Sequence, residues 1–467
     1  MNIKGKSDIT EGKMFFKIVK YVIPLMLTHM LQVFYSIADM MVVDLSGSQD
    51  AVGAIGTTVP FVNLIINLCI GFATGTTVVL GYSLGAKNDE KSAKTVHTSL
   101  VLAGVLGLLG AALGISLAHP LLSLMGAQGQ VLELAVLYIR IYLGALPFIA
   151  VSTYVAAIFR AMGNGQVPLW TALSCGAINL GLNVFFVKGC GMSVDGVATA
   201  TFISNFISTV IYLYFLAIER GCCRFSFRKL SFDKKIAGEI FKAGLPVGVQ
   251  SSLMSLCNMY VQSSVLSLNN LLTPEGAAFQ PIIKGDSAVT NLEYLAQSGI
   301  VATSSAAIVF TSRHRGARKP ERIPRLIFIC AAISFGLTAF FCGMMLLFNK
   351  PLLSLYGVEN GVVGSAEALG YNTALMRLLI CTCSFLFSAV SEISVGCSRG
   401  LGSSTLPTVI DFVCQGMIPV LWCAVAFPLL PTAVMLYLLY PISRIISAIG
   451  QSALAVKVYK RNAFSDL

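Results

Sequence analysis

The chain has 467 residues, of which 56% are hydrophobic and only 11% are charged, and its mean hydropathy is +0.80. A soluble protein carries roughly 25% charged residues, so this composition excludes an ordinary water-soluble domain. The net charge of +11 would suit nucleic acid in a soluble protein, but here long apolar runs reach the roughly 20 residues that cross a bilayer. The composition predicts a multi-pass membrane protein that binds no nucleic acid.

Twelve apolar segments follow one another along the chain, separated by turn clusters rich in Gly, Pro, Ser or Asn. We expect membrane helices at 17–43, 52–84, 94–119, 131–159, 166–187, 193–219, 237–268, 276–311, 322–348, 362–397, 404–427 and 432–457. The first twenty residues are polar and basic, unlike a cleavable signal, so we expect the first helix to stay. The charged stretch 221–236 is the best linker candidate and predicts an N-terminal lobe at 1–220 and a C-terminal lobe at 237–467.

A seven-residue phrase occurs twice, since Pro120 to Gly126 returns with one change as Pro351 to Gly357, 231 positions later. Similar shifts relate Lys20 and Pro24 to Lys242 and Pro246, Gly85-Ala86-Lys87 to Gly316-Ala317-Arg318, and Arg160 and Gly163 to Arg399 and Gly402. Each half holds an even number of spans, so both halves enter the membrane in the same orientation. The sequence therefore predicts an all-α membrane protein with twelve transmembrane helices in two pseudo-twofold-related six-helix lobes. Two such lobes favour a transporter over a channel.

Basic residues are concentrated on one predicted side of the membrane. The N-terminus, the loops after the second, sixth and eighth spans, and the C-terminus hold 24 of the 32 basic residues. By the positive-inside rule, we expect a plasma (inner) membrane protein with both termini in the cytoplasm. The 13 cysteines lie mostly inside apolar runs, where Cys acts as a small hydrophobe. We expect no metal, no cofactor and no enzymatic chemistry.

The first span carries a polar face on an otherwise apolar helix. Six polar residues fall within about 120° of one another at 100° per residue: Thr28, His29, Gln32, Tyr35, Ser36 and Asp39. A charge inside a span is expensive, so Asp39 needs a reason. Either Asp39 lies near the outer helix end and reaches water, or it faces a cavity where it can take up a proton or hold a cation.

Two later helices of the first half have similar polar faces. Asn179 and Asn183 are four residues apart in the fifth span, and the sixth span carries Thr201, Ser204, Asn205 and Ser208. Such faces often hold helices together by hydrogen bonds, and they can also line a ligand cavity. Three of them in one six-helix lobe favour a cavity that contains water.

The second half is chemically different, because Val261 occupies the position that corresponds to Asp39. Its polar candidates for a substrate cavity are Asn258, Gln262, Asp286, Glu293 and Glu392, and Asp411 is a further intramembrane acid. Asp286 and Glu293 share a helix face, and Lys284 could pair with either of them. For these charged residues an internal ion pair is the alternative to a cavity role.

These segments resemble the multidrug and toxic compound extrusion (MATE) transporters over nearly the whole chain. The most specific likeness is Asn179-Leu-Gly-Leu-Asn183 followed by Gly191-Met-Ser-Val-Asp-Gly196-Val-Ala-Thr-Ala-Thr201. Weaker likenesses are Tyr35-Ser-Ile-Ala-Asp39, Gly81-Tyr-Ser-Leu-Gly85-Ala86-Lys87, Arg160-Ala-Met-Gly163 with Pro168, and Gly244-Leu245-Pro246. Their order and spacing together make the resemblance strong.

The resemblance implies a secondary antiporter that exports amphipathic, cationic small molecules in exchange for H⁺ or Na⁺. It assigns cation or proton coupling to Asp39, Asn179 and Thr201. Asn183 belongs to the same group of coupling candidates, although many prokaryotic members have Asp at this position. Asp39 is therefore the one carboxylate of the group. The expected partners are the substrate and the lipid bilayer, and we expect a monomer. The alternative function is a flippase for a lipid-linked saccharide or another lipid.

Overall fold

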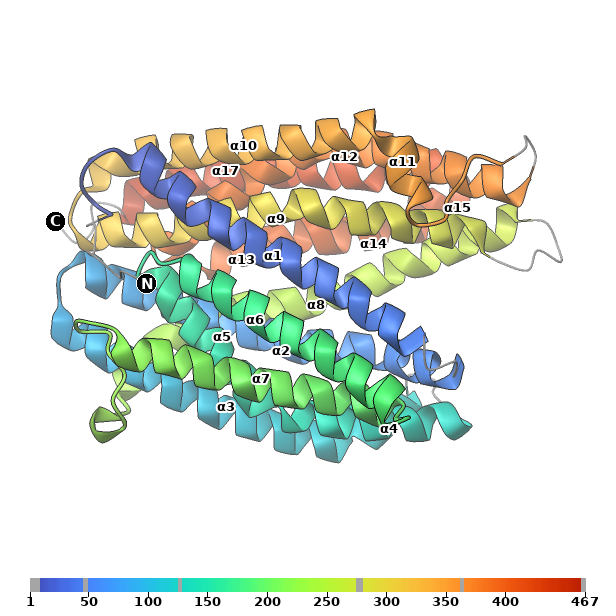
Figure 1. Cartoon of the computed structure of the whole chain (residues 1–467). Coiled ribbons are helices and arrows are strands. Elements are labelled where there is room, and N and C mark those ends of the chain that lie inside the picture. The colour runs from blue at the N-terminus through green and yellow to red at the C-terminus, as the bar shows by residue number, and fades with distance from the viewer. Residues whose placement is uncertain (1–8, 45–48, 125–127, 274–279, 362–364, 463–467) are drawn as a thin grey trace. The chain divides into compact units, whose positions relative to one another are not determined.

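The computed structural model describes residues 9–44, 49–124, 128–273, 280–361 and 365–462, and within them it contains helices and loops but no strand. Among these residues the side chains of 36–41, 43, 44, 49–53, 124 and 229 are not described. Figure 1 shows the chain coloured from the N-terminus to the C-terminus. The predicted all-α membrane fold is confirmed.

The first half of the sequence forms seven α-helices. They are α1 (Met14–Asp44), α2 (Gln49–Gly85), α3 (Asp89–Leu124), α4 (Gly129–Gly144), α5 (Leu146–Ala161), α6 (Gln166–Val184) and α7 (Val194–Ile218). A π-helical segment, η1 (Phe185–Gly189), continues α6. The bounds lie within a few residues of the predicted spans, because long apolar runs with polar ends fix where a membrane helix stops.

The second half forms ten α-helical segments after the 3₁₀ turn η2 (Phe227–Lys229). They are α8 (Lys234–Leu272), α9 (Pro281–Gly316), α10 (Ile323–Leu347), α11 (Asn349–Ser354), α12 (Ala366–Gly400), α13 (Thr405–Asp411), α14 (Ile418–Leu421), α15 (Phe427–Leu429), α16 (Ala433–Tyr437) and α17 (Leu439–Asn462). A second 3₁₀ turn, η3 (Pro320–Arg322), joins α9 to α10. The additional segments arise because prolines and π turns interrupt the predicted spans.

Ten helical stretches of the described residues are long and apolar enough to cross a membrane, and α4 with α5 makes an eleventh span. The 39-residue α8 has the length of a span but a more polar sequence, and it was predicted as the seventh span. Counted with α8, the helices are consistent with the predicted twelve.

Proline explains where two of these spans are broken. The α4–α5 pair bends by 47°, and Pro147 stands at the start of α5, where it has no N–H to bond the preceding turn. The eleventh predicted span runs as α13, η4 (Phe412–Met417), α14, η5 (Trp422–Ala426) and α15, with Pro419 and Pro428 inside it. Neither proline has the N–H group that would donate to the preceding turn of an α-helix, and this favours the wider π turns next to them.

The sequence repeat is also a repeat of backbone conformation. Lys87 and Arg318 both have φ of 54°, and each closes the end of its helix, α2 or α9. Gly163 and Gly402 match in the same way, with φ of 82° and 81°. A non-glycine residue with positive φ is uncommon, so its occurrence at corresponding positions shows that the two halves use the same helix-ending turns.

The described contacts divide the chain into two compact units. One contains Met1–Ser252 and Val309–Pro320, and the other contains Leu253–Ile308 and Glu321–Leu467. The division falls inside α8 because Ile236 and Ile240 belong to the apolar core of the first unit, whereas Val261 and Leu268 belong to a core of the second. A lobe boundary at 221–236 stays a prediction.

Candidate functional site

The polar face of α1 begins at residues that are already hydrogen-bonded. The buried Thr28 hydroxyl donates to the Pro24 carbonyl at 2.8 Å, so this hydroxyl is already hydrogen-bonded within α1. His29 lies within hydrogen-bonding reach of the Gln32 side chain, and Gln32 itself is exposed. These predicted residues therefore share a face, as the helical spacing indicated.

Tyr35 ties α1 to α6. Its hydroxyl donates to the Leu173 carbonyl at 3.1 Å, and its ring fills the space beside Gly176, where an added Cβ would lie 1.9 Å from a ring carbon. Only glycine at position 176 allows the ring to lie this close to α6. This contact fixes how the polar face of α1 aligns with α6.

The backbone of Asp39 belongs to α1, but its side chain and that of Ser36 lie outside the described part of the structure. Asp39 is four residues after Tyr35, which is a rise of about 6 Å along a helix. α1 and α6 run in the same direction (Figure 1), so α1 continues from Tyr35 toward Asp39 as α6 continues from Gly176 toward Asn179. The coupling role of Asp39 stays a prediction.

The predicted residues of α6 and α7 form one hydrogen-bonded network. The Asn183 amide donates to the side-chain oxygen of Asn179 at 3.3 Å, and the Asn179 amide donates to the Ser204 hydroxyl at 3.1 Å. Ser204 in turn donates to the Thr201 carbonyl at 3.1 Å. We call Asn179, Asn183, Thr201 and Ser204 the neutral network. Its four residues lie on two helices, and the bond between Asn179 and Ser204 joins α6 to α7.

The neutral network offers oxygen atoms without any formal charge among its own members. The Thr201 hydroxyl donates to the Val197 carbonyl at 3.0 Å, and Asn183 is fully buried. Amide and hydroxyl oxygens are ligands for hard cations such as Na⁺, and they also accept hydrogen bonds from a protonated carboxyl group. A carboxylate at the level of Asn179 would therefore supply the missing charge.

The second half holds a buried charged cluster that the sequence indicated only in part. Arg377 on α12 is 4% exposed and forms two hydrogen bonds with the Glu293 carboxylate, at 3.3 and 2.8 Å. Its other terminal nitrogen pairs with Asp286, and the Tyr437 hydroxyl donates to the same Asp286 oxygen at 3.0 Å. We call Asp286, Glu293, Arg377 and Tyr437 the charged cluster.

Among the described residues, the acids pair with Arg377 and not with Lys284, which the sequence had left open as a partner. Lys284 is exposed, and its ammonium group donates to the Gly357 carbonyl at 2.7 Å. The partner of both acids is Arg377, which lies 91 residues after Asp286 and 84 after Glu293. An arginine inside a span is itself a signal for a buried acid, since an unpaired charge there is too costly.

The remaining candidates of the second half lie apart from this cluster. The Ser304 hydroxyl donates to the backbone carbonyl of Glu392 at 3.0 Å and lies 3.4 Å from its carboxylate. Glu392 also interacts electrostatically with Asp411 and Arg399. Asn258 and Gln262 are exposed on α8. Their assignment to a substrate cavity stays a prediction.

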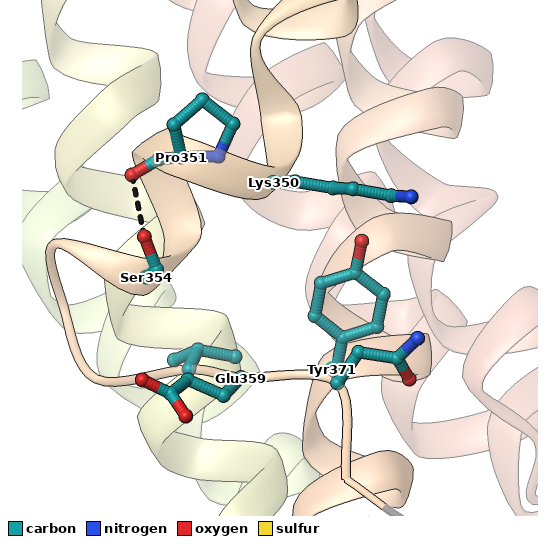
Figure 2. A pocket seen from close by; sticks show the side chains of 7 residues that line it. Lys350, Pro351, Ser354, Glu359 and Tyr371 are labelled. Carbon is teal, nitrogen blue, oxygen red and sulfur yellow. Dashed lines mark hydrogen bonds between the residues drawn. The ribbon is translucent and has the colours of Figure 1, made fainter.

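A pocket of about 300 Å³ lies at the loop after α11 (Figure 2). It includes part of the repeated phrase, where the Ser354 hydroxyl donates to the Pro351 carbonyl at 2.9 Å. Its lining residues are Lys350, Pro351, Ser354, Val358, Glu359, Asn360 and Tyr371. None of the predicted site residues lines it, so this pocket is separate from both the neutral network and the charged cluster.

The chain is similar to proteins whose names refer to multidrug resistance and multidrug export. The family model described as MatE matches residues 24–185 and 285–425. The probable multidrug resistance protein YoeA of Bacillus subtilis is 25% identical over 398 residues, which cover 84% of this chain and 82% of YoeA. The multidrug export protein MepA of Staphylococcus saprophyticus is 22% identical and covers 89% of this chain and 87% of its own.

Solved structures show the same fold. A structure described as the outward-facing conformation of a multidrug resistance MATE family transporter superposes with a TM-score of 0.88 at 19% identity over 99% of each chain. A MOP superfamily transporter from Pyrococcus furiosus gives a TM-score of 0.87, also at 19% identity, over 98% of this chain and 99% of its own. With the family model matching more than half of its length, the chain belongs to the MatE family of multidrug efflux transporters.

Proposed function

We propose that this transporter is a secondary antiporter that exports amphipathic, cationic small molecules in exchange for H⁺ or Na⁺. The names of its relatives refer to multidrug resistance and multidrug export, which supports a drug-like substrate class. Two lobes with the same orientation would rock about a shared cleft and expose it to either side of the membrane in turn. Ion movement down its gradient would drive this exchange.

The observation that carries the proposal is the neutral network beside α1. Hydrogen bonds join Asn179 to Asn183 on α6 and to Ser204 on α7, and Tyr35, which is four residues before Asp39, bonds α1 to α6. Asp39 would supply the one negative charge of this site. Neutralising it by H⁺ or by a bound Na⁺ would change which hydrogen bonds the network can form and so favour one access state.

The proposed orientation places both termini in the cytoplasm of the plasma membrane. Basic residues gather at the chain ends and in the loops after α2, α7 and α9. Positive residues are retained on the cytoplasmic side during insertion, which supports this assignment. The ends of α2 and α9 that carry Lys87 and Arg318 would then face the cytoplasm.

Transport in proteoliposomes tests the coupling. A cationic dye is loaded, and an H⁺ gradient and a Na⁺ gradient are imposed separately. We expect one gradient to drive dye movement and Asp39→Asn to abolish that response while the protein stays folded. Glu133→Gln is the matched control, because it neutralises an exposed acid on α4. Full gradient-driven transport by Asp39→Asn would refute the role of Asp39.

The same assay separates the flippase alternative. A flippase for a lipid-linked saccharide would move a labelled lipid between leaflets and would leave the dye unmoved under either gradient. We expect the opposite result. A dye that stays in place under both gradients, together with movement of the labelled lipid, would replace the antiporter proposal by the flippase.

A further inference from the structure

The ends of α2 and α9 meet in a contact that repeats itself. A Cβ added at Gly85 would lie 2.2 Å from the Arg313 carbonyl oxygen, and one added at Gly316 would lie 2.1 Å from the Tyr82 carbonyl oxygen. The 231-residue shift relates Tyr82 to Arg313 and Gly85 to Gly316. Gly85 therefore touches Arg313, and the corresponding glycine, Gly316, touches the corresponding residue, Tyr82. Residues related by a twofold axis exchange contacts in this way.

The close contact extends along one face of α2. Gly81 lies against Ser312, so that an added Cβ would be 2.2 Å from the Ser312 hydroxyl oxygen and 3.3 Å from its Cβ. Further along α2, Gly71 meets Gly248 and Gly75 meets the backbone of α8 at Ile240. The four glycines Gly71, Gly75, Gly81 and Gly85 fall within about 120° of one another around the axis of α2. One glycine face thus lets α8 and α9 approach backbone to backbone.

Polar groups fasten the end of α9 at the same place. Two guanidinium nitrogens of Arg313 donate to the Ala161 carbonyl at the end of α5, at 3.1 and 2.9 Å. The Arg315 guanidinium lies 5.5 Å from the centre of the Tyr82 ring. Lys319 pairs with Glu11 at 3.6 Å. Helices from both sequence halves are therefore joined by backbone contact and by a few exposed or half-buried polar bonds.

We propose that this crossing is a latch that closes the cytoplasmic side of the transport path and parts when that side opens. The latch consists of Gly81, Gly85, Ser312, Arg313 and Gly316. Glycine contacts have no interlocked side chains, so the helices can separate without repacking an apolar core. The carbonyl of Ala161 would return to water when Arg313 leaves it. This inference rests on the proposed alternating access and orientation.

A disulfide across the latch tests the proposal. The starting protein has all 13 cysteines replaced by Ala or Ser. Gly81→Cys and Ser312→Cys are then added, and their Cβ atoms would lie 3.3 Å apart. This distance is close to the roughly 3.5–4.5 Å between the Cβ atoms of a disulfide. Oxidation is followed by loss of reactive thiols in a maleimide shift assay. We expect oxidation to cut gradient-driven dye transport by about tenfold or more and reduction to restore it, because one access state is trapped.

The matched control joins two helices of the same half. Gly107 on α3 and Ala150 on α5 are also in close contact, with an added Cβ at Gly107 lying 3.2 Å from the Ala150 Cβ. Oxidised Gly107→Cys/Ala150→Cys should transport within about twofold of its reduced form, since its two helices need not separate. Full transport by the oxidised latch pair would overturn the proposal. Absence of gradient-driven transport in the reduced proteins would instead refute the proposed function.

A second pair covers the case in which buried substitutions disturb folding. Glu11→Cys and Lys319→Cys change two surface residues whose side chains are 65% and 34% exposed. A short bridging maleimide reagent should block transport, whereas a long flexible one should leave it intact. Equal transport with both reagents would show that the two segments do not move apart and would contradict the latch.

Discussion

The neutral network of α6 and α7 and the charged cluster of α9, α12 and α16 occupy two halves built on the same repeat, yet they use opposite chemistry. The neutral network holds Asn, Ser and Thr, whose hydrogen bonds can be exchanged at small cost. The charged cluster holds a buried arginine between two acids. The comparison teaches that one half is joined by uncharged hydrogen bonds that can be exchanged, whereas the other is held together by buried ion pairs.

The largest effect should come from Arg377→Met. This change leaves Asp286 and Glu293 buried without their counter-ion, which should reduce the free energy of unfolding by about 3–5 kcal/mol. Thermal unfolding in detergent measures the loss. Arg140→Met is the control, because Arg140 occupies the corresponding place in the first half but is exposed. Adding Asp286→Asn and Glu293→Gln should recover most of the stability, and an unchanged melting temperature in Arg377→Met alone would remove the contrast.

Gly176→Ala should give the next largest effect. The new methyl group would overlap the Tyr35 ring and push α1 away from α6, at a cost of about 1–3 kcal/mol. Gly181→Ala on the same helix is the control, since nothing lies within 4 Å of its added Cβ, and it should be neutral or stabilising. The melting temperature and gradient-driven transport should both fall for Gly176→Ala. Equal behaviour of the two variants would show that α1 is not aligned by Tyr35.

A smaller effect is expected for Asn179→Ala, which removes the centre of the neutral network. The lost bonds to Ser204 and Asn183 should reduce the free energy of unfolding by about 1–2 kcal/mol, and coupled transport should fall by more than stability explains. Asn205→Ala is the control, because Asn205 donates to a carbonyl of its own helix. If Asn179→Ala kept full ion dependence, the network would be structural only.

The smallest effect should follow Lys284→Met. Its ammonium group is exposed and donates to one loop carbonyl, so we expect a loss below about 1 kcal/mol and normal transport. The comparison is with Arg377→Met, measured in the same unfolding assay. A loss similar to that of Arg377→Met would place Lys284 within the charged cluster after all.

The sequence predicted the helices well because apolar length and turn residues are local signals. The ends of α2 and α7 were placed within one residue or two, and the repeated turns at Lys87 and Arg318 were visible as a repeated phrase. The breaks inside the eleventh span were missed, since they depend on how Pro419 and Pro428 are accommodated in π turns.

Side-chain partners were harder to predict than helices. Asn179 and Asn183 were grouped correctly because they are one turn apart, whereas Arg377 reaches acids more than eighty residues away. Lys284 was considered as a partner of Asp286 or Glu293 because it is close to Asp286 in sequence, but it is exposed near the start of α9 and bonds the Gly357 carbonyl. Sequence spacing predicts contacts within a helix and says little about which helix lies opposite.

The reciprocal contact of Gly85 and Gly316 also has a consequence for symmetry. In a homodimer of one six-helix chain, a single glycine and a single partner would make this contact twice, once on each side of the axis. Here both sides carry a glycine at corresponding positions, whereas the partners are different residues, Tyr82 and Arg313. Because both sides belong to one chain, each can carry its own residue, and Arg313 uses two guanidinium nitrogens to bond the Ala161 carbonyl of α5.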